Sequence, residues 1–114
     1  MAENRIILEL GAGADLHGGD YTKAAKRAVE DAMRHSSLSL FRSLDLQALS
    51  MRVEITIGVQ EPDKVDPEAV AACAPYGQIS VQAVEGGLRI PKEEGATIIA
   101  NALVSVSFDI EEAA

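Results

Sequence analysis

Aromatic residues are scarce in this chain: it has no tryptophan, two tyrosines and two phenylalanines, so that aromatics make up 4% of its residues. Hydrophobic residues reach 47%, but many of them are alanines. The sequence therefore predicts a thin core in which aliphatic strands pack against alanine-faced helices. At 114 residues the chain is expected to form a single domain, residues 1–114. A core this thin favours association with other subunits as a way to bury the second face of a sheet.

Positive charge is also scarce, since 10 lysines and arginines stand against 18 acidic residues and give a net charge of −8. The basic residues are scattered, so we expect no surface suited to a phosphate backbone and no nucleic-acid partner. No apolar run is long enough to cross a membrane, and the first residues contain neither a basic segment nor a cleavage site. The sequence therefore predicts a cytoplasmic protein with no membrane partner.

Cysteine is limited to Cys73, which excludes a disulfide within the chain. The residue stands among alanines, in Ala71-Ala72-Cys73-Ala74. This context favours a small packing residue of a helix over a nucleophile.

The first half of the chain has strand patterns on either side of a helix pattern. Residues 5–10 alternate and give a strand with one strongly apolar face, formed by Ile6, Leu8 and Leu10. A helix is predicted from Tyr21 to about His35, capped by Asp20 or Thr22. Residues 36–50 fit no single period and are expected to form an irregular connection with one short helical turn. Residues 51–59 are apolar at every odd position, which predicts the cleanest strand of the chain.

The second half predicts a short helix followed by more strands. Asp66-Pro67-Glu68 provides a cap, an early proline and an early acid, and the helix that begins there should reach about Ala74. Strands are predicted over residues 79–83 and 102–110, with a short rung over 88–90. The order β, α, β, α, β, β predicts an α+β two-layer sandwich, a mixed sheet with helices on one face.

The polar positions of these strands are mostly short and uncharged: Thr56, Ser80, Gln82, Ser105 and Ser107. A freely solvated sheet face usually carries more lysine and glutamate. Only two helices are predicted, one of them short, and they leave this face uncovered. We therefore expect a homo-oligomer, with a trimer as the first choice.

Residues 11–20, Gly-Ala-Gly-Ala-Asp-Leu-His-Gly-Gly-Asp, connect the first strand to the first helix and contain the best candidate site. Asp15 and His17 are two residues apart, so in an extended segment they would point to the same side and could share a proton as a catalytic acid–base pair. The alternative is that Asp15 caps a turn and His17 packs against the following helix. A metal would need further ligands, of which Glu9 and Asp20 are the nearest in sequence, and we assign no metal site.

The glycines around this pair do not form a nucleotide-binding motif. A dinucleotide fingerprint needs glycine where Leu16 stands, and a phosphate loop needs lysine and a hydroxyl residue where the chain has Gly18-Gly19-Asp20. The common hydrolase signatures Gly-x-Ser-x-Gly and His-Glu-x-x-His are absent from the sequence. Because glycine lets the backbone approach a ligand closely, Gly11, Gly13 and Gly18 are candidate ligand contacts.

A second glycine break, Glu85-Gly86-Gly87, ends a later strand and is followed by Arg89. A turn with positive φ explains these glycines equally well. The two breaks could meet within one chain or across a subunit boundary, and we favour the boundary because clefts between subunits supply concavity. In that arrangement Glu85, Gly86, Gly87 and Arg89 complete the ligand site begun by Asp15 and His17.

The pattern Gly11-x-Gly13-x-Asp15-x-His17-Gly18, followed by Asp20-x-Thr22-Lys23-Ala24-Ala25 and later by Val84-Glu85-Gly86-Gly87-Leu88, resembles a small family of conserved hypothetical proteins, mainly bacterial with plant members. The resemblance spans most of the chain and implies that this motif is the family's shared feature, without implying a substrate. A more distant likeness in size and topology concerns ring-opening amidohydrolases of the cyanuric acid hydrolase type, which look like three fused units of about this length. The Ser-Gly-Gly sequence associated with their catalytic serines is missing here.

The main functional hypothesis is a small-molecule enzyme or ligand-binding protein that uses Asp15 and His17 for proton transfer or substrate anchoring. The acidic chain favours a neutral, cationic or metal-bound ligand, and no cofactor is assigned. The alternative is a non-catalytic homo-oligomeric assembly module in which the motif is architectural. A ring-opening hydrolase is the further alternative.

Overall fold

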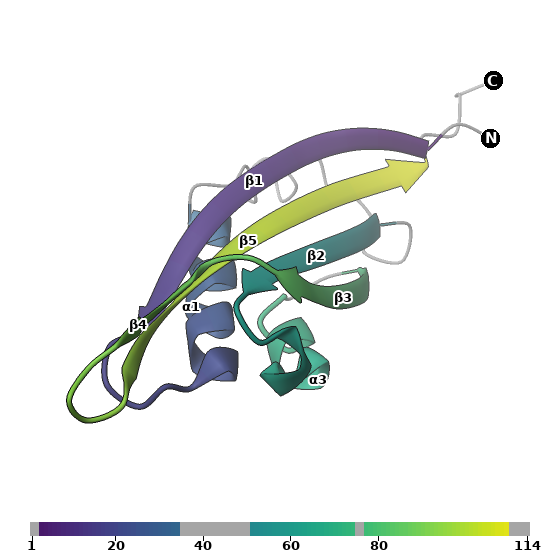
Figure 1. Cartoon of the computed structure of the whole chain (residues 1–114). Coiled ribbons are helices and arrows are strands. Elements are labelled where there is room, and N and C mark those ends of the chain that lie inside the picture. Colours follow the sequence, from purple (N-terminus) through teal and green to yellow (C-terminus); the bar gives the residue numbers. More distant parts are fainter. Residues whose placement is uncertain (1–2, 35–50, 75–76, 110–114) are drawn as a thin grey trace, which may run out of the picture.

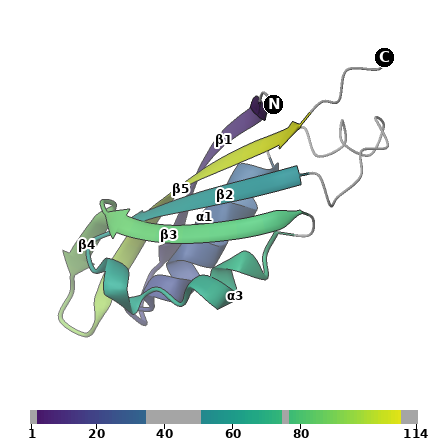
Figure 2. The same ribbon diagram turned by 90° about the vertical axis from the view of Figure 1, so that its right-hand side faces the viewer.

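The computed structural model describes residues 3–34, 51–74 and 77–109, which form a five-stranded mixed sheet with helices on one face (Figures 1 and 2). The elements in chain order are β1 (Glu3–Asp15), α1 (Tyr21–Arg34), β2 (Met51–Val59), the 3₁₀ turn η2 (Pro62–Lys64), α3 (Pro67–Ala71), β3 (Gln78–Glu85), β4 (Leu88–Pro91) and β5 (Ala96–Asp109). The predicted α+β fold and the order of its elements are confirmed. None of the described helices is long and apolar enough to span a membrane.

The sheet has the order β1-β5-β2-β3, and β4 is an additional partner of β5. Strands β2 and β3 are parallel, whereas β1, β2 and β4 all run antiparallel to β5. The long strand β5 pairs with β2 along its second half and with β4 along its first half, so β4 extends the sheet where β2 has ended. The sequence predicted β4 as a short rung, but it missed the first half of β5, whose residues 96–101 do not alternate clearly.

The core lies between the sheet and α1. The odd positions of β2, including Ile55 and Ile57, are buried as the alternation predicts, and they meet Ile98 of β5 and Val70 of α3. The helix contributes mainly small side chains, namely Ala24, Ala25, Ala28, Val29 and Ala32, all fully buried. The thin core of aliphatic strands against an alanine-faced helix is therefore present.

Strand β1 differs from the prediction in length and in the face it buries. Gly11 to Asp15 continue the strand instead of forming a turn, because Gly11 and Gly13 face α1 and let it pack directly on the strand. A Cβ atom at Gly11 would contact the Ala28 carbonyl oxygen, and one at Gly13 would contact the Ala28 nitrogen. At Gly11 and Gly13, α1 therefore packs against the backbone of β1.

The predicted apolar face of β1 consequently points away from α1. Leu8 is 55% exposed and Leu10 is 70% exposed on the opposite side of the sheet. Alternation correctly predicts that the two sides of the strand differ, but it does not reveal that glycines form the packed side.

Helix α1 begins as predicted and α3 ends earlier than predicted. The Asp20 carboxylate accepts a hydrogen bond from the Lys23 backbone nitrogen at 3.1 Å, which identifies Asp20 as the cap of α1. Asp66 caps α3, as its position before Pro67 indicates, but the regular helix stops at Ala71 instead of Ala74. The irregular connection predicted over residues 36–50 lies outside the described residues.

Candidate functional site

Asp15 ends β1 on the side of the sheet that α1 covers, and it is 5% exposed. Its Oδ2 accepts a hydrogen bond from the Asp20 backbone nitrogen at 2.9 Å. Its Oδ1 lies 3.9 Å from Nη1 of Arg27 and 4.0 Å from Nζ of Lys23. The buried carboxylate is thus paired with two cations of α1 and connects the end of the strand to the start of the helix.

The backbone of residues 16–19 is held against the turn between β4 and β5. The Leu16 carbonyl accepts hydrogen bonds from the Thr97 hydroxyl and from Nζ of Lys92, both at 3.0 Å. Gly95 has a φ of +77°, and a Cβ atom there would contact the His17 carbonyl oxygen, so this turn requires glycine. Several contacts therefore fix the loop that presents His17.

His17 is exposed, and within the described part of the chain its ring has no hydrogen bond or ion pair. The expected pairing with Asp15 is not formed, because the extended conformation ends at Asp15 and the chain bends at Leu16 and His17. The carboxylate faces Lys23 and Arg27 instead. The alternative in which His17 packs against the helix is not observed either.

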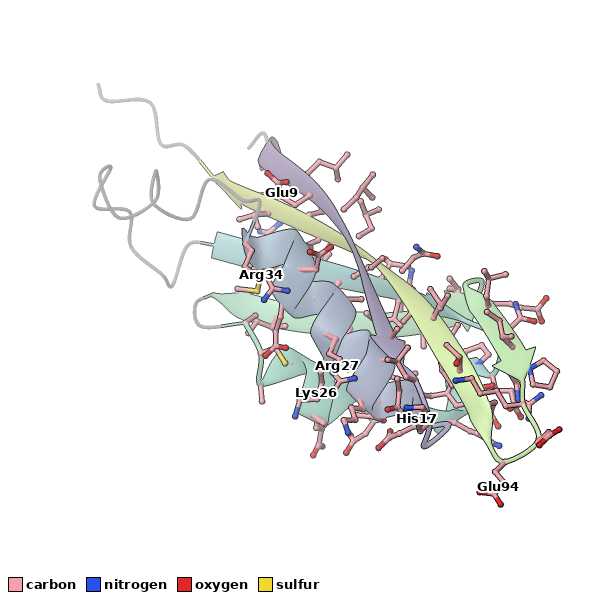
Figure 3. All side chains as sticks on the ribbon, turned by 90° about the vertical axis from the view of Figure 1, so that its left-hand side faces the viewer. Glu9, His17, Lys26, Arg27, Arg34 and Glu94 are labelled. Atoms are coloured by element: carbon pink, nitrogen blue, oxygen red, sulfur yellow. The ribbon has the colours of Figure 1, made fainter. Side chains whose placement is uncertain are left out.

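A cleft of about 410 Å³ opens above this loop, and its lining residues are Asp15, Leu16, His17, Gly18, Asp20, Lys23 and Arg27. A second depression of about 440 Å³ adjoins it along α1 and shares Asp20, Lys23 and Arg27 with it. Figure 3 shows His17 beyond the N-terminal end of α1, with Arg27 and Lys26 following on the exposed side of the helix. The motif and the first turns of α1 thus border two depressions that adjoin at Asp20, Lys23 and Arg27.

Sequence reasoning missed the contribution of Lys23 and Arg27 to this cleft. They are four residues apart, which places them on one side of α1, and their side chains remain 54% and 46% exposed. The Arg27 side chain is also fixed by a 2.6 Å hydrogen bond from Nη1 to the Ala14 carbonyl. A basic pair at this spacing directly after the motif was the signal that could have identified them.

Among the described residues, no group of three or more histidine, cysteine, aspartate or glutamate side chains could hold a metal ion. Glu9 lies near the other end of α1 from His17, as Figure 3 shows. Asp20 lines the cleft, but its Oδ1 accepts the capping hydrogen bond of α1. The two residues considered as further metal ligands are therefore not assembled around His17.

Of the glycines proposed as ligand contacts, only Gly18 lines the cleft. Its missing side chain leaves room for the Asp15 carboxylate, since a Cβ atom would lie 3.0 Å from Oδ2. Gly11 and Gly13 lie under α1 instead. The motif glycines therefore separate into two that allow helix packing and one that borders the cleft.

The second glycine break lets the chain cross from β3 to β4 over the end of β2. The Gly86 nitrogen donates to the Val59 carbonyl at 2.9 Å, and Gly87, with a φ of +60°, packs against the Ile99 carbonyl. Nε2 of Gln60 donates to the carbonyls of Gly86 and Gly87, at 3.1 Å each. Positive φ and close backbone approach explain this break, and Glu85, exposed before it, does not line the cleft.

Arg89 of β4 lies opposite Ile98 of β5, and the other neighbour of Ile98 is Asp15. The two glycine breaks therefore approach each other within one chain. Arg89 nevertheless does not line the cleft and instead lies near Tyr21 and Glu61. Whether a second subunit contributes to the site stays a prediction.

Tyr21 and Glu61 form a polar cluster that the sequence did not indicate. The buried Tyr21 hydroxyl donates to Oε2 of Glu61 at 2.8 Å, and Nζ of Lys64 lies 3.3 Å from Oε1. Burial and the bond to Glu61 raise the pKa of Tyr21. The hydrogen bonds from Tyr21 and Lys64 lower the pKa of Glu61. The cluster connects the first turn of α1 to η2.

Comparison with known proteins agrees with this fold. A family profile described as "Conserved hypothetical protein (Lin0512_fam)" matches residues 5–106. The crystal structure of an FtsZ-like protein of unknown function from Nostoc punctiforme is 30% identical, with a TM-score of 0.82, and the match covers 96% of this chain and 99% of that one. Among curated proteins, none matches this chain in sequence. The chain belongs to the Lin0512 family of conserved hypothetical proteins.

Proposed function

We propose that this protein binds a small polar molecule in the cleft above Asp15. The observation that carries the proposal is the exposed, unpaired ring of His17 in a cleft of about 410 Å³ whose backbone is fixed on several sides. Ligand pockets of about this volume are common, and a few well-placed polar groups usually fix the ligand's orientation. Among the residues that the structure describes, none forms a hydrogen bond or ion pair with the His17 ring.

The roles of the lining residues follow from their surroundings. His17 provides a ring that can donate or accept a hydrogen bond. Lys23 and Arg27 provide donors that remain partly exposed. The buried Asp15 carboxylate positions both side chains through its ion pairs with them. Because Asp15 does not face His17, we assign ligand binding, with Asp15 as a positioning residue, and no reaction.

The charge of the cleft constrains the ligand. Asp15 and Asp20 balance Lys23 and Arg27, so the lining has no net charge when His17 is neutral. The net charge of −8 for the chain disfavours attraction of anions from a distance. We therefore expect an uncharged or zwitterionic ligand that carries both donors and acceptors.

A thermal-shift screen of amino acids, nucleosides and sugars tests the proposal. A compound that stabilises the wild type should lose most of its effect on His17→Ala, because a ligand raises the melting temperature only if it binds the folded state in preference to the unfolded chain. Glu94→Gln, a change at an exposed position in the nearby turn and outside the cleft, is the matched control and should respond as the wild type does. A compound that stabilises His17→Ala as strongly as the wild type would exclude His17 from the site.

The assembly-module alternative is favoured by the packing of Gly11 and Gly13 under α1, which gives half of the motif an architectural role. In this alternative the loop of residues 16–19 only connects β1 to α1, and His17→Ala changes no binding. The ring-opening hydrolase alternative gains nothing from the cleft, because no serine is among its lining residues.

A further inference from the structure

We infer that the sheet face opposite α1 binds a second copy of this chain. We call this surface the open face. It is formed by alternate positions of all five strands: the even-numbered residues of β1 from Leu8 onward and of β2, β3 and β4, and the odd-numbered residues of β5 from Thr97 to Ser107. The ligand cleft lies on the other side of the sheet, so this inference does not depend on the proposed function.

The open face carries large apolar side chains that are exposed in the single chain. Leu10 is 70% exposed, and Leu88, near the other end of the sheet, is 56% exposed. Leu8, Val84 and Ile90 are exposed as well. Contiguous apolar patches on a small soluble protein mark interaction surfaces, whereas single exposed leucines need no explanation.

Strand pairing makes this apolar surface continuous. Leu10 of β1 lies beside Leu103 of β5. Ile99 of β5 lies between Ala14 of β1 and Leu88 of β4. An apolar path therefore crosses the sheet from β1 to β4 without an intervening charge. A flat surface of this kind is suited to another sheet, since two sheets pack face to face at about 10 Å through interleaved side chains.

The charge of the open face favours a second copy as its occupant. Among the open-face side chains that the structure describes, only Arg52 and Glu54 are charged, and their charges cancel, although the whole chain carries −8. Charged residues are depleted at the centre of protein interfaces. A basic partner would be attracted by the net negative charge of the chain, but the described open-face side chains carry no excess of negative charge. Two copies can bring identical neutral faces together while their acidic residues stay outside the contact.

The described helices leave the open face uncovered. Figure 1 shows α1 and α3 on the same side of the sheet, and the buried apolar positions of β2 and β5 face that side. On the open face, the small side chains of Thr97, Ser105 and Ser107 are buried as well. A contact between two open faces would therefore place two sheets between two outer layers of helices. Such a contact uses the same residues on both copies and predicts a dimer with a two-fold axis, in place of the trimer expected from the sequence.

Sedimentation of the whole chain, with Leu10→Lys and Leu88→Lys as variants, tests the inference. The wild type should sediment at about twice the 12.0 kDa chain mass at micromolar concentration. Each lysine should raise the dissociation constant by more than about 100-fold, because the contact would bury its charge in both copies. Ala72→Lys, which adds the same charge at an exposed position on the helix side, should leave the assembly intact.

Circular dichroism of each variant separates loss of assembly from loss of folding. Leu10 and Leu88 are exposed in the single chain, so both lysine variants should keep the wild-type spectrum. A folded, monomeric Leu10→Lys protein beside an assembled Ala72→Lys protein supports the open face as the contact. A wild type that remains a monomer up to about 100 µM, or an assembly that neither lysine variant weakens, would overturn the inference.

Discussion

At the scale of single residues, Asp15 and His17 differ in their surroundings, and the proposed function gives them different roles: Asp15 positions the lining of the cleft, and His17 contacts the ligand. Asp15 is buried and paired, whereas His17 is exposed and without a side-chain partner among the described residues. The buried Asp15 carboxylate, with its two cations and its backbone donor, stabilises the loop. Removing its charge would leave these groups without their partner, which costs free energy. Mutations of the two residues should therefore have separate effects.

Asp15→Asn should lower the free energy of unfolding by about 1–3 kcal/mol, because it removes the negative charge that faces Lys23 and Arg27 inside the protein. Urea denaturation followed by circular dichroism measures the loss. Asp63→Asn, at an exposed position of η2, is the matched control and should change stability by less than about 0.5 kcal/mol. Equal stabilities for the two variants would show that the Asp15 pairs contribute nothing to folding.

His17→Ala should leave the free energy of unfolding within about 0.5 kcal/mol of the wild type, because the ring is exposed and has no hydrogen bond or ion pair among the described residues. The same denaturation experiment measures this value. A loss of 2 kcal/mol or more would indicate a structural role and favour the assembly-module alternative.

At the scale of elements, the contact between α1 and β1 depends on two positions without side chains. Gly13→Ala should lower the free energy of unfolding by more than about 2 kcal/mol, because the new methyl group would force α1 away from the strand. Gly19→Ala should cost only about 1 kcal/mol, since its φ of +64° is strained for alanine but nothing lies within 4 Å of the added atom. Comparing the two urea midpoints distinguishes close packing from backbone strain.

The connection between α1 and η2 predicts a dependence of stability on pH. The lowered pKa of Glu61 means that its contribution is present above its ordinary value of 4.5 and is lost as the pH falls through the lowered value. The raised pKa of Tyr21 means that its contribution is present below its ordinary value of 10.0 and is lost as the pH rises through the raised value. Both groups therefore favour folding across the neutral range.

Tyr21→Phe tests this connection, because it removes the hydroxyl that donates to Glu61. The variant should melt below the wild type at pH 7, and the difference should shrink as the pH falls below 4.5 and Glu61 becomes protonated. Melting curves of both proteins between pH 3 and 8 provide the measurement. A difference in melting temperature that stays constant over this pH range would show that the hydrogen bond between Tyr21 and the charged form of Glu61 does not contribute to stability.

At the scale of the whole molecule, the sequence predicts elements better than it predicts which side chains meet. The alternation of β2 and the cap of α1 at Asp20 are local patterns, and both appear as predicted. The buried side of β1 depends on close packing of α1 against two glycines, which no hydrophobic pattern records. For the same reason the exposed leucines of β1 look like core residues in the sequence.

For the candidate site, the sequence singles out a segment but does not predict its contacts. Residues 15–18 do border a cleft. Their spacing could not show that the chain bends after Asp15 and turns this carboxylate toward Lys23 and Arg27. Nor could it show that Gly86 and Gly87 serve a strand crossing, since that role depends on where β2 ends relative to β5.

The most direct test of the central claim, that the cleft above Asp15 binds a small molecule, is NMR mapping of amide signals during a screen of polar fragments. A 12.0 kDa chain is suited to this method even as a dimer. Fragments that bind should shift the amides of residues 16–18 and of the first turns of α1, and His17→Ala should abolish these shifts while Glu94→Gln keeps them. Fragments whose shifts gather elsewhere on the molecule, or persist unchanged in His17→Ala, would contradict the account.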